Sequence, residues 1–141
     1  MFRVIQWNVK INSDPELIIE CLKNNSGNKY TIINLQEVSE KLMDCIKENF
    51  KDSYFAYSLE YRKPGHFEGK NRKMGVATII IGGKINKADI LNETVFPERT
   101  LYSEIEINKK IVKNLTFHSL TGCDYKKAKS SNFASIASFL Y

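Results

Sequence analysis

Residues 30–35 constrain the fold of this chain most, because they form a nearly continuous apolar run of strand length. Such a run is typical of a strand in a sheet that is covered on both faces. Residues 75–81 form a second buried run of this kind, which Gly82 and Gly83 end. The sequence therefore predicts a sheet whose central strands need cover on two sides.

A β-α-β unit surrounds the first of these runs. Residues 3–7 are a short β-prone segment, and Asp14 and Pro15 then form a helix start, with an N-cap residue and a proline in the first turn. Gly27 follows the helix and readily takes a positive φ. The crossover places the two strands parallel, so we expect their carboxyl ends at the same edge of one sheet.

The rest of the chain extends this unit into one α/β domain, residues 1–141. Ser39 caps a second helix, residues 54–61 are predicted to be a strand, and a last helix begins at about Tyr125. Residues 101–107 and 111–117 form a hairpin. Three helices can cover only one face of the sheet, so we expect an open apolar face that self-association or a partner covers.

Charge and cysteine content narrow the function classes. The net charge is +5 and the pI is about 9.0, which favours anionic partners such as nucleic acid, although AT-biased coding would also enrich lysine. The three cysteines have no paired spacing, which argues against disulfides and zinc.

No apolar run is long enough to span a membrane and no signal peptide is present, so a cytoplasmic location is predicted. No serine hydrolase, P-loop or dinucleotide-binding motif occurs.

Asn8 and Glu37 are the first polar candidates, because each lies just past the end of a predicted parallel strand. Ligands of open α/β sheets bind beyond the carboxyl ends of the strands. A carboxylate and an amide there suit Mg²⁺ or Mn²⁺, since Mg²⁺ takes one or two protein carboxylates and keeps several waters. The alternative is that both are ordinary turn residues.

Basic residues supply the second group of candidates. His118 ends the last predicted strand and could act as a general acid or base, or have a structural role. Arg99 could bind a phosphate through two hydrogen bonds, or lie on the surface. Arg72 and Lys73 belong to a basic loop, residues 62–73, that could follow a phosphate backbone or be simply solvated.

Taken in order, these segments resemble the endonuclease/exonuclease/phosphatase family, which includes deoxyribonuclease I. Residues 3–9 are similar to its opening strand with a Trp-Asn motif, and residues 32–38 are similar to its second strand with a Gln-Glu motif. Residues 75–80 resemble its glycine-led strand, and residues 99–107 and 115–122 resemble the strands with its arginine and histidine. The resemblance implies half of a four-layer α/β sandwich, with a mixed β-sheet and helices on one face.

The resemblance also implies roles for individual residues. Glu37 would bind the catalytic Mg²⁺, Asn8 would support the metal and phosphate, Arg99 would contact the phosphate, and His118 would position or protonate it. The family's later Asp-x-Asn motif and Asp-His pair do not occur in this sequence. We therefore expect the N-terminal half of such an enzyme, with weak or no turnover by itself.

Three functions stay open at this point. The first is a Mg²⁺-dependent phosphodiesterase lineage with a nucleic-acid substrate. The second is a non-catalytic binding or assembly module of the same fold. The third is a hydrolase of phospholipid headgroups or small phosphate esters.

Overall fold

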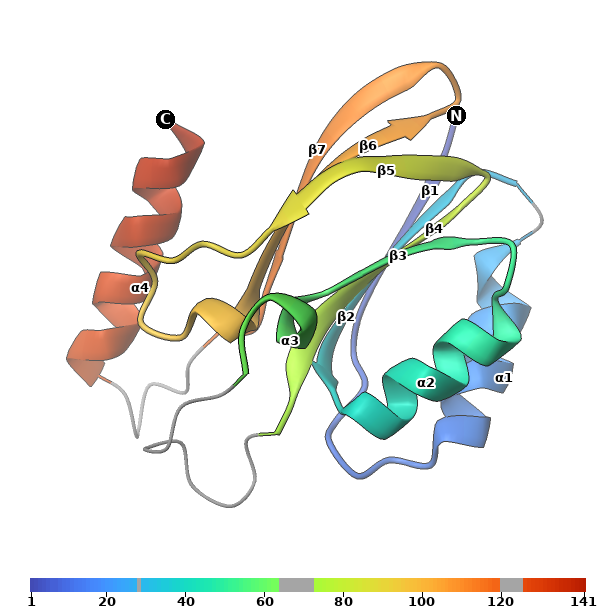
Figure 1. Cartoon of the computed structure of the whole chain (residues 1–141), viewed down its shortest axis with the longest axis horizontal. Coiled ribbons are helices and arrows are strands. Elements are labelled where there is room, and N and C mark those ends of the chain that lie inside the picture. Colours follow the sequence, from blue (N-terminus) through green and yellow to red (C-terminus); the bar gives the residue numbers. More distant parts are fainter. Residues whose placement is uncertain (28, 64–72, 120–125) are drawn as a thin grey trace.

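The structure is a computed structural model that describes residues 1–27, 29–63, 73–119 and 126–141. In chain order its elements are β1 (Arg3–Asn8), α1 (Pro15–Ser26), β2 (Thr31–Val38), α2 (Glu40–Asn49), β3 (Tyr54–Tyr57), α3 (Ser58–Tyr61), β4 (Gly75–Ile81), β5 (Gly83–Asp89), the 3₁₀ turn η1 (Pro97–Arg99), β6 (Thr100–Ile107), β7 (Lys110–Phe117) and α4 (Lys126–Leu140). They form two stacked sheets with helices outside them (Figure 1).

The first sheet has the strand order β1-β2-β4-β3. Strands β1 and β2 are parallel, as the β-α-β pattern predicts, whereas β4 is antiparallel to both β2 and β3. The mixed sheet is thus confirmed. The strand predicted for residues 54–61 is too long, because β3 ends at Tyr57 and Ser58–Tyr61 is a helical turn.

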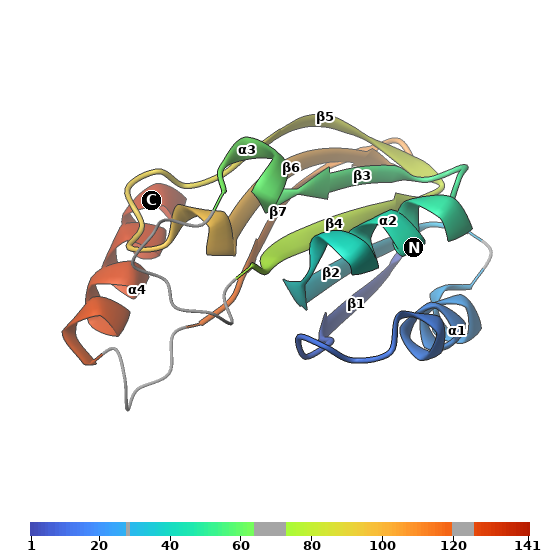
Figure 2. The same ribbon diagram turned by 60° about the horizontal axis from the view of Figure 1, so that its bottom comes forward.

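Helices α1 and α2 cover one face of this sheet (Figure 2). Both begin at the predicted caps: the Asp14 carboxylate accepts the Glu16 N–H at 3.0 Å, and the Ser39 hydroxyl accepts the Leu42 N–H at 3.2 Å. Their apolar residues pack on alternate residues of the central strands, including Ile33 of β2. Gly27 has a φ of +68°, as expected for a residue that ends a helix.

A second sheet, with the strand order β5-β6-β7, covers the other face. Ile32 and Ile80 of the first sheet pack against Ile105 and Ile107 of β6. The expectation of an open apolar face is therefore wrong for the central strands, because this chain supplies their cover itself. The physical reason is that residues 83–89, which received no element in the sequence analysis, pair with the hairpin and complete a second layer.

Glycine allows the chain to cross from one sheet to the other. Gly82, between β4 and β5, has a φ of +72°, and a Cβ on Gly83 would lie 2.6 Å from the carbonyl oxygen of Glu106. The predicted hairpin β6-β7 is confirmed, with Ile107 opposite Lys110. Its two turn residues, Asn108 and Lys109, both have positive φ, as in a type I′ turn.

Helix α4 lies on the outer side of the second sheet at one end (Figures 1 and 2). Its Phe139 and Phe133 make edge-to-face contacts with Tyr102 of β6 and Phe117 of β7, at centroid distances of 5.2 and 5.9 Å. The layers are thus helix pair, sheet, sheet and α4. No helix in the described parts of the chain is long and apolar enough to cross a membrane.

Candidate metal and phosphate site

Asn8, Glu37 and His118 lie together at one end of the sheets. The Asn8 side-chain amide donates to Glu37 Oε1 at 3.0 Å, and His118 Nε2 lies 3.4 Å from the same oxygen. The side chains of Glu37 and His118 are each 18% exposed, so the group is enclosed but open to solvent. The structure therefore brings together the three residues that the sequence singled out at strand ends.

Glu37 reaches this position through a β-bulge. Its φ is +61°, and the pairing of β2 with β4 shifts register between Gln36 and Val38. In a regular strand Glu37 would follow Ile33 and Leu35 onto the helix-covered face. Val38 takes that core position instead. The left-handed conformation of Glu37 is costly for a residue with a side chain, and backbone strain of this kind concentrates at functional sites.

His118 comes from the second sheet, not from the sheet that carries Glu37. Alternate residues of β7 face the first sheet: Asn114 and Thr116 hydrogen-bond across to it, and His118 continues this face one step beyond the strand. The His118 N–H donates to the carbonyl of Arg99 at 2.9 Å, which extends the β6-β7 pairing. The site is thus formed where the two sheets end together, rather than along one sheet edge.

The loop after β1 contributes main-chain groups that the sequence analysis missed. The Ile11 N–H donates to Glu37 Oε2 at 2.9 Å, and the Lys10 N–H donates to Asn8 Oδ1 at 2.9 Å. Lys10 and Asn12 have positive φ, so the loop is tightly curled around the carboxylate. Asparagine is enriched among residues with positive φ, so Asn12 is a local signal of this turn.

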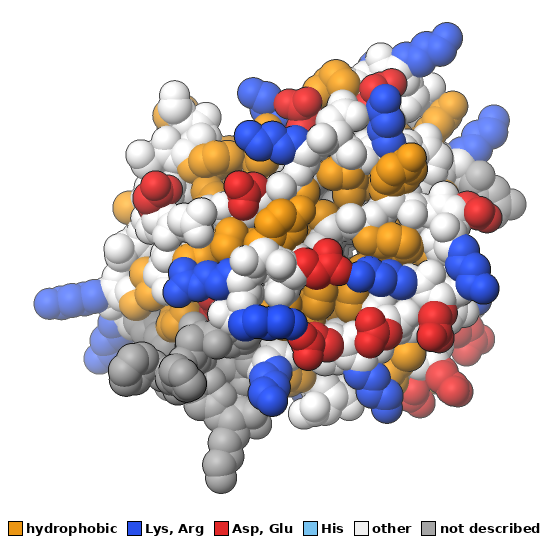
Figure 3. All heavy atoms as spheres, in the orientation of Figure 1, with side chains coloured by type: hydrophobic (Ala, Val, Ile, Leu, Met, Phe, Trp, Pro, Cys, Tyr) orange, Lys and Arg blue, Asp and Glu red, His pale blue; other side chains and the backbone are white. Residues whose placement is uncertain are grey.

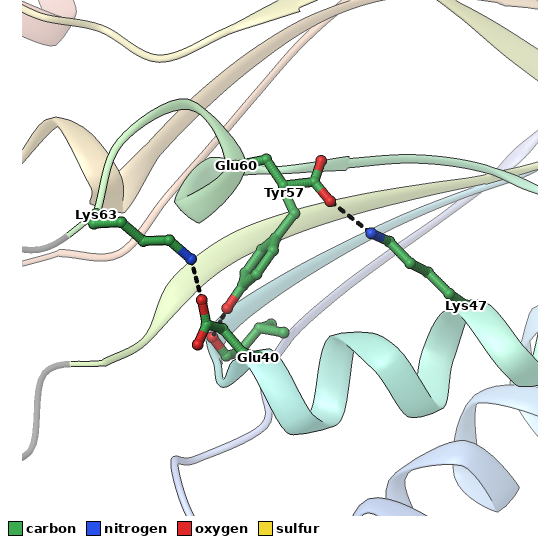
Figure 4. Close-up of polar contacts among 6 residues, drawn as sticks. Glu40, Lys47, Tyr57, Glu60 and Lys63 are labelled. Atoms are coloured by element: carbon green, nitrogen blue, oxygen red, sulfur yellow. Dashed lines mark hydrogen bonds and ion pairs between the residues drawn. The ribbon is translucent and has the colours of Figure 1, made fainter.

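The chain on the far side of the bulge is anchored by Tyr57 (Figure 4). Its hydroxyl donates to the carbonyl of Val38 at 2.8 Å. Burial raises the pKa of Tyr57, and the carboxylates of Glu40, Glu60 and Asp44 raise it further, so the hydroxyl keeps its proton. Glu40 pairs with Lys63, and Glu60 with Lys47, around the same ring.

The remaining candidates are placed differently. Arg99 is buried, with 6% of its surface exposed, so the alternative of a surface arginine is wrong. Its guanidinium lies 4.9 Å from the centroid of the Phe96 ring. Lys73 is exposed and interacts electrostatically with Glu40. Arg72 lies outside the described residues.

The charges at the site set its protonation at neutral pH. Burial alone would raise the pKa of Glu37, but the hydrogen bonds from Ile11 and Asn8 and the charges of His118 and Arg99 lower it overall. Burial lowers the pKa of His118, and the positive charge of Arg99 lowers it further. The negative charge of Glu37 raises it, but by less, so the pKa is lowered overall. Glu37 is therefore an anion and His118 is a neutral imidazole at pH 7.

Acid should destabilise the fold in two steps. His118 and Glu37 both have lower pKa values in the folded protein than their ordinary values of 6.5 and 4.5. The unfolded chain therefore takes up a proton more readily than the folded protein at both residues. Each contribution is complete above the ordinary value and is lost as the pH falls through the lower folded value. We expect the Tm to fall below pH 6.5 and again below pH 4.5, and His118→Gln to remove the first step. A first step that persists in His118→Gln would contradict this assignment.

The described residues contain no group of three or more His, Cys, Asp or Glu side chains that could hold a metal ion. The donor set at this site is instead one ionised carboxylate with a neighbouring amide, open to water. This composition fits Mg²⁺, which needs few protein carboxylates and retains water ligands.

Two solved structures have a similar fold. One is a humanized form of TDP2 from D. rerio, with 14 mutations, at a TM-score of 0.73 and 11% identity over 96% of this chain and 57% of that chain. The other is a truncated TDP2 from Caenorhabditis elegans, at a TM-score of 0.69 and 16% identity over 97% of this chain and 53% of that chain. This chain thus spans somewhat more than half the length of both.

These likenesses show the fold, which is that of DNase I-like α/β sandwiches. No protein family model matches the sequence, and no curated protein matches it either.

Proposed function

We propose that this chain carries the Glu37 half of the active site of a Mg²⁺-dependent phosphodiesterase. The observation that supports this most is the carboxylate itself. Glu37 is held in a strained bulge by two hydrogen bonds, stays ionised at pH 7 and faces a neutral imidazole. A carboxylate that only ended a strand would need none of these features.

Each residue of the site has a distinct task in this proposal. Glu37 holds the metal through its carboxylate, and the Asn8 amide and Ile11 N–H fix the orientation of that carboxylate. When bound, Mg²⁺ stabilises the negative charge that develops as a phosphate ester is hydrolysed. Of the two roles that the resemblance implies for His118, we propose that it positions the phosphate, because a neutral imidazole hydrogen-bonds a phosphate oxygen but has no acidic proton to transfer. Arg99 acts as a buried positive charge beside both side chains; its direct contact with phosphate remains a prediction.

Nucleic acid is the substrate class that we favour. TDP2, whose fold this chain shares, is tyrosyl-DNA phosphodiesterase 2. The net charge of +5 also favours a polyanion. Acidic side chains gather over helices α1 and α2 (Figure 3), so we expect the nucleic acid to bind away from the middle of this helix layer. Lys73, which interacts with Glu40 at the start of α2, and Arg72 are the candidate contacts. A cytoplasmic location remains part of this proposal.

The first experiment asks whether the metal binds at Glu37. Mn²⁺ is added to ¹⁵N-labelled protein, and the amide signal of Ile11 is followed because this N–H bonds the carboxylate. We expect its signal to broaden before signals of the second sheet, such as that of Ile105, and excess Mg²⁺ to reverse the effect. Uniform broadening across the protein would argue against a site at Glu37.

The second experiment separates the substrate classes and the non-catalytic module. The chain is incubated with Mg²⁺ and single-stranded DNA, RNA, a phospholipid or bis(p-nitrophenyl) phosphate. Cleavage of DNA or RNA supports the proposal, and cleavage of the phospholipid or the small ester alone supports the third function. Because the chain carries only half of the proposed site, cleavage should be weak, and metal binding with no cleavage above a protein-free control would favour the binding module.

A further inference from the structure

A row of buried hydrogen bonds joins the two sheets across their apolar interface. Asn34 and Asn114 exchange side-chain hydrogen bonds at 2.8 and 3.1 Å, and Asn114 also donates to Ser103 at 3.1 Å. Thr78 donates to Asn34 at 2.9 Å. One step nearer the site, the Gln36 amide donates to the Thr116 hydroxyl at 3.1 Å. These bonds lie among residues that are otherwise apolar.

The Gln36–Thr116 bond is next to the site on both of its strands. Gln36 directly precedes Glu37, and Thr116 lies two residues before His118 on the same face of β7. Both side chains are buried, with 6% and 1% of their surface exposed. The bond therefore connects the strand that carries the carboxylate to the strand that carries the imidazole.

Apolar packing alone does not fix how two sheets are aligned, because the hydrophobic effect has no directional preference. A buried hydrogen bond does, because sliding one sheet leaves a donor or an acceptor without a partner and away from water. His118 and Glu37 come from different sheets, so their separation depends on this alignment.

We propose that Gln36 and Thr116 are positioning residues, whose hydrogen bond sets the alignment of the two sheets and so holds His118 against Glu37. The importance of the His118 position for catalysis rests on the proposed function, whereas the placement of His118 against Glu37 is a property of the fold. Neither Gln36 nor Thr116 touches the metal or the substrate in this proposal.

The test measures how exposed His118 Nε2 is in the absence of metal and substrate. Diethyl pyrocarbonate acylates neutral imidazole, and the rate at His118 is followed by mass spectrometry of its peptide. Thr116→Val keeps the shape of the side chain but removes the hydroxyl, whereas Thr116→Ser keeps the hydroxyl. We expect an acylation rate at least threefold higher in Thr116→Val and a rate within 1.5-fold of the parent in Thr116→Ser.

Two further variants separate positioning from general loss of stability. Ile105→Val removes a methyl group from the same interface, where Ile105 is fully buried, and leaves the hydrogen bonds intact. Its His118 rate should match that of the parent. Gln36→Met removes the bond from the other strand and should raise the rate as Thr116→Val does, which also covers the case in which Thr116→Val fails to fold.

Three results would overturn the proposal. They are a parent-like rate in Gln36→Met or in a folded Thr116→Val, a raised rate in Thr116→Ser, and an equal increase in Ile105→Val. Because the probe requires neither Mg²⁺ nor hydrolysis, these results do not depend on whether the proposed phosphodiesterase activity is found.

Discussion

Glu37→Gln should bring the weak Mg²⁺-dependent phosphodiester hydrolysis that we expect of this half-site down to the rate of a protein-free control, because removing a single charge-stabilising group from an active site costs about 100-fold or more. The substitution keeps the size of the side chain and its ability to accept the Ile11 N–H, but it removes the negative charge that we assign to metal binding. The measurement is the initial rate of nucleic-acid cleavage at saturating Mg²⁺. Mn²⁺-dependent broadening of the Ile11 amide signal should disappear in parallel.

Glu40→Gln is the matched control for this prediction. Glu40 lies three residues further along the chain, is exposed and pairs with Lys63 at the surface. Exposed ion pairs contribute little to stability, about 0–1 kcal/mol, so this variant should fold normally and keep its rate within about twofold. A parent rate above that of the protein-free control that Glu37→Gln leaves unchanged would exclude Glu37 as the metal-binding carboxylate.

Gly75→Ala should produce the largest loss of stability among the glycine substitutions near the site, about 2–3 kcal/mol. A Cβ on Gly75 would lie 2.4 Å from the hydroxyl oxygen of Ser58 and 2.9 Å from Leu59 Cγ. The Ser58 hydroxyl is fixed, because it donates to the carbonyl of Glu98 at 2.5 Å and accepts the Val76 N–H at 2.9 Å. Thermal unfolding should show a Tm about 6–12 °C lower, judged from the size of the domain.

Gly27→Ala provides the comparison, because it separates lack of space from backbone strain. At Gly27 the nearest atom to a Cβ is 3.7 Å away, so space is available, but the φ is +68°. Its ψ is 179°, and this combination of φ and ψ is almost confined to glycine, so a residue with a Cβ there costs about 1–3 kcal/mol. We therefore expect decreases in Tm of similar size at Gly27 and Gly75, and a clearly smaller decrease at Gly75 would show that Ser58 moves aside easily.

Gly75 also affects the site at a distance. Ser58 connects the start of β4 to Glu98, the residue before Arg99, and Gly75 is paired with Val38 next to the bulge. Displacement of Ser58 would therefore disturb both the buried arginine and the strand end that carries Glu37. Loss of stability and loss of activity should accompany each other in this variant, unlike in Glu37→Gln.

Local patterns in the sequence were sufficient for much of the first sheet. Cap residues such as Asp14 and Ser39 marked the helix starts, and continuous apolar runs marked β2 and β4. The parallel pairing of β1 with β2 followed from the crossover between them. These features were predictable because neighbouring residues determine them.

Features that depend on the second sheet were not predictable in the same way. The polar and weakly alternating segment of β5 has no strong strand pattern, and its pairing with β6 is what closes the open face. Arg99 has a charged side chain that normally lies at the surface, and only the packing around η1 buries it. Residues 58–61 continue the composition of β3, yet form a helical turn.

The sequence by itself determined which residues stand at the ends of β1, β2 and β7, because strand length and periodicity are local properties of the chain. Only the tertiary structure decided that Asn8, Glu37 and His118 meet. That contact requires a bulge that turns Glu37 away from the helix-covered face, and a second sheet stacked so that β7 ends above β2. The bulge forms in the pairing of β2 with β4, where Val38 lies opposite Gly75, and the stacking depends on contacts between residues about 80 positions apart, such as Gln36 and Thr116. No local pattern encodes either of these contacts.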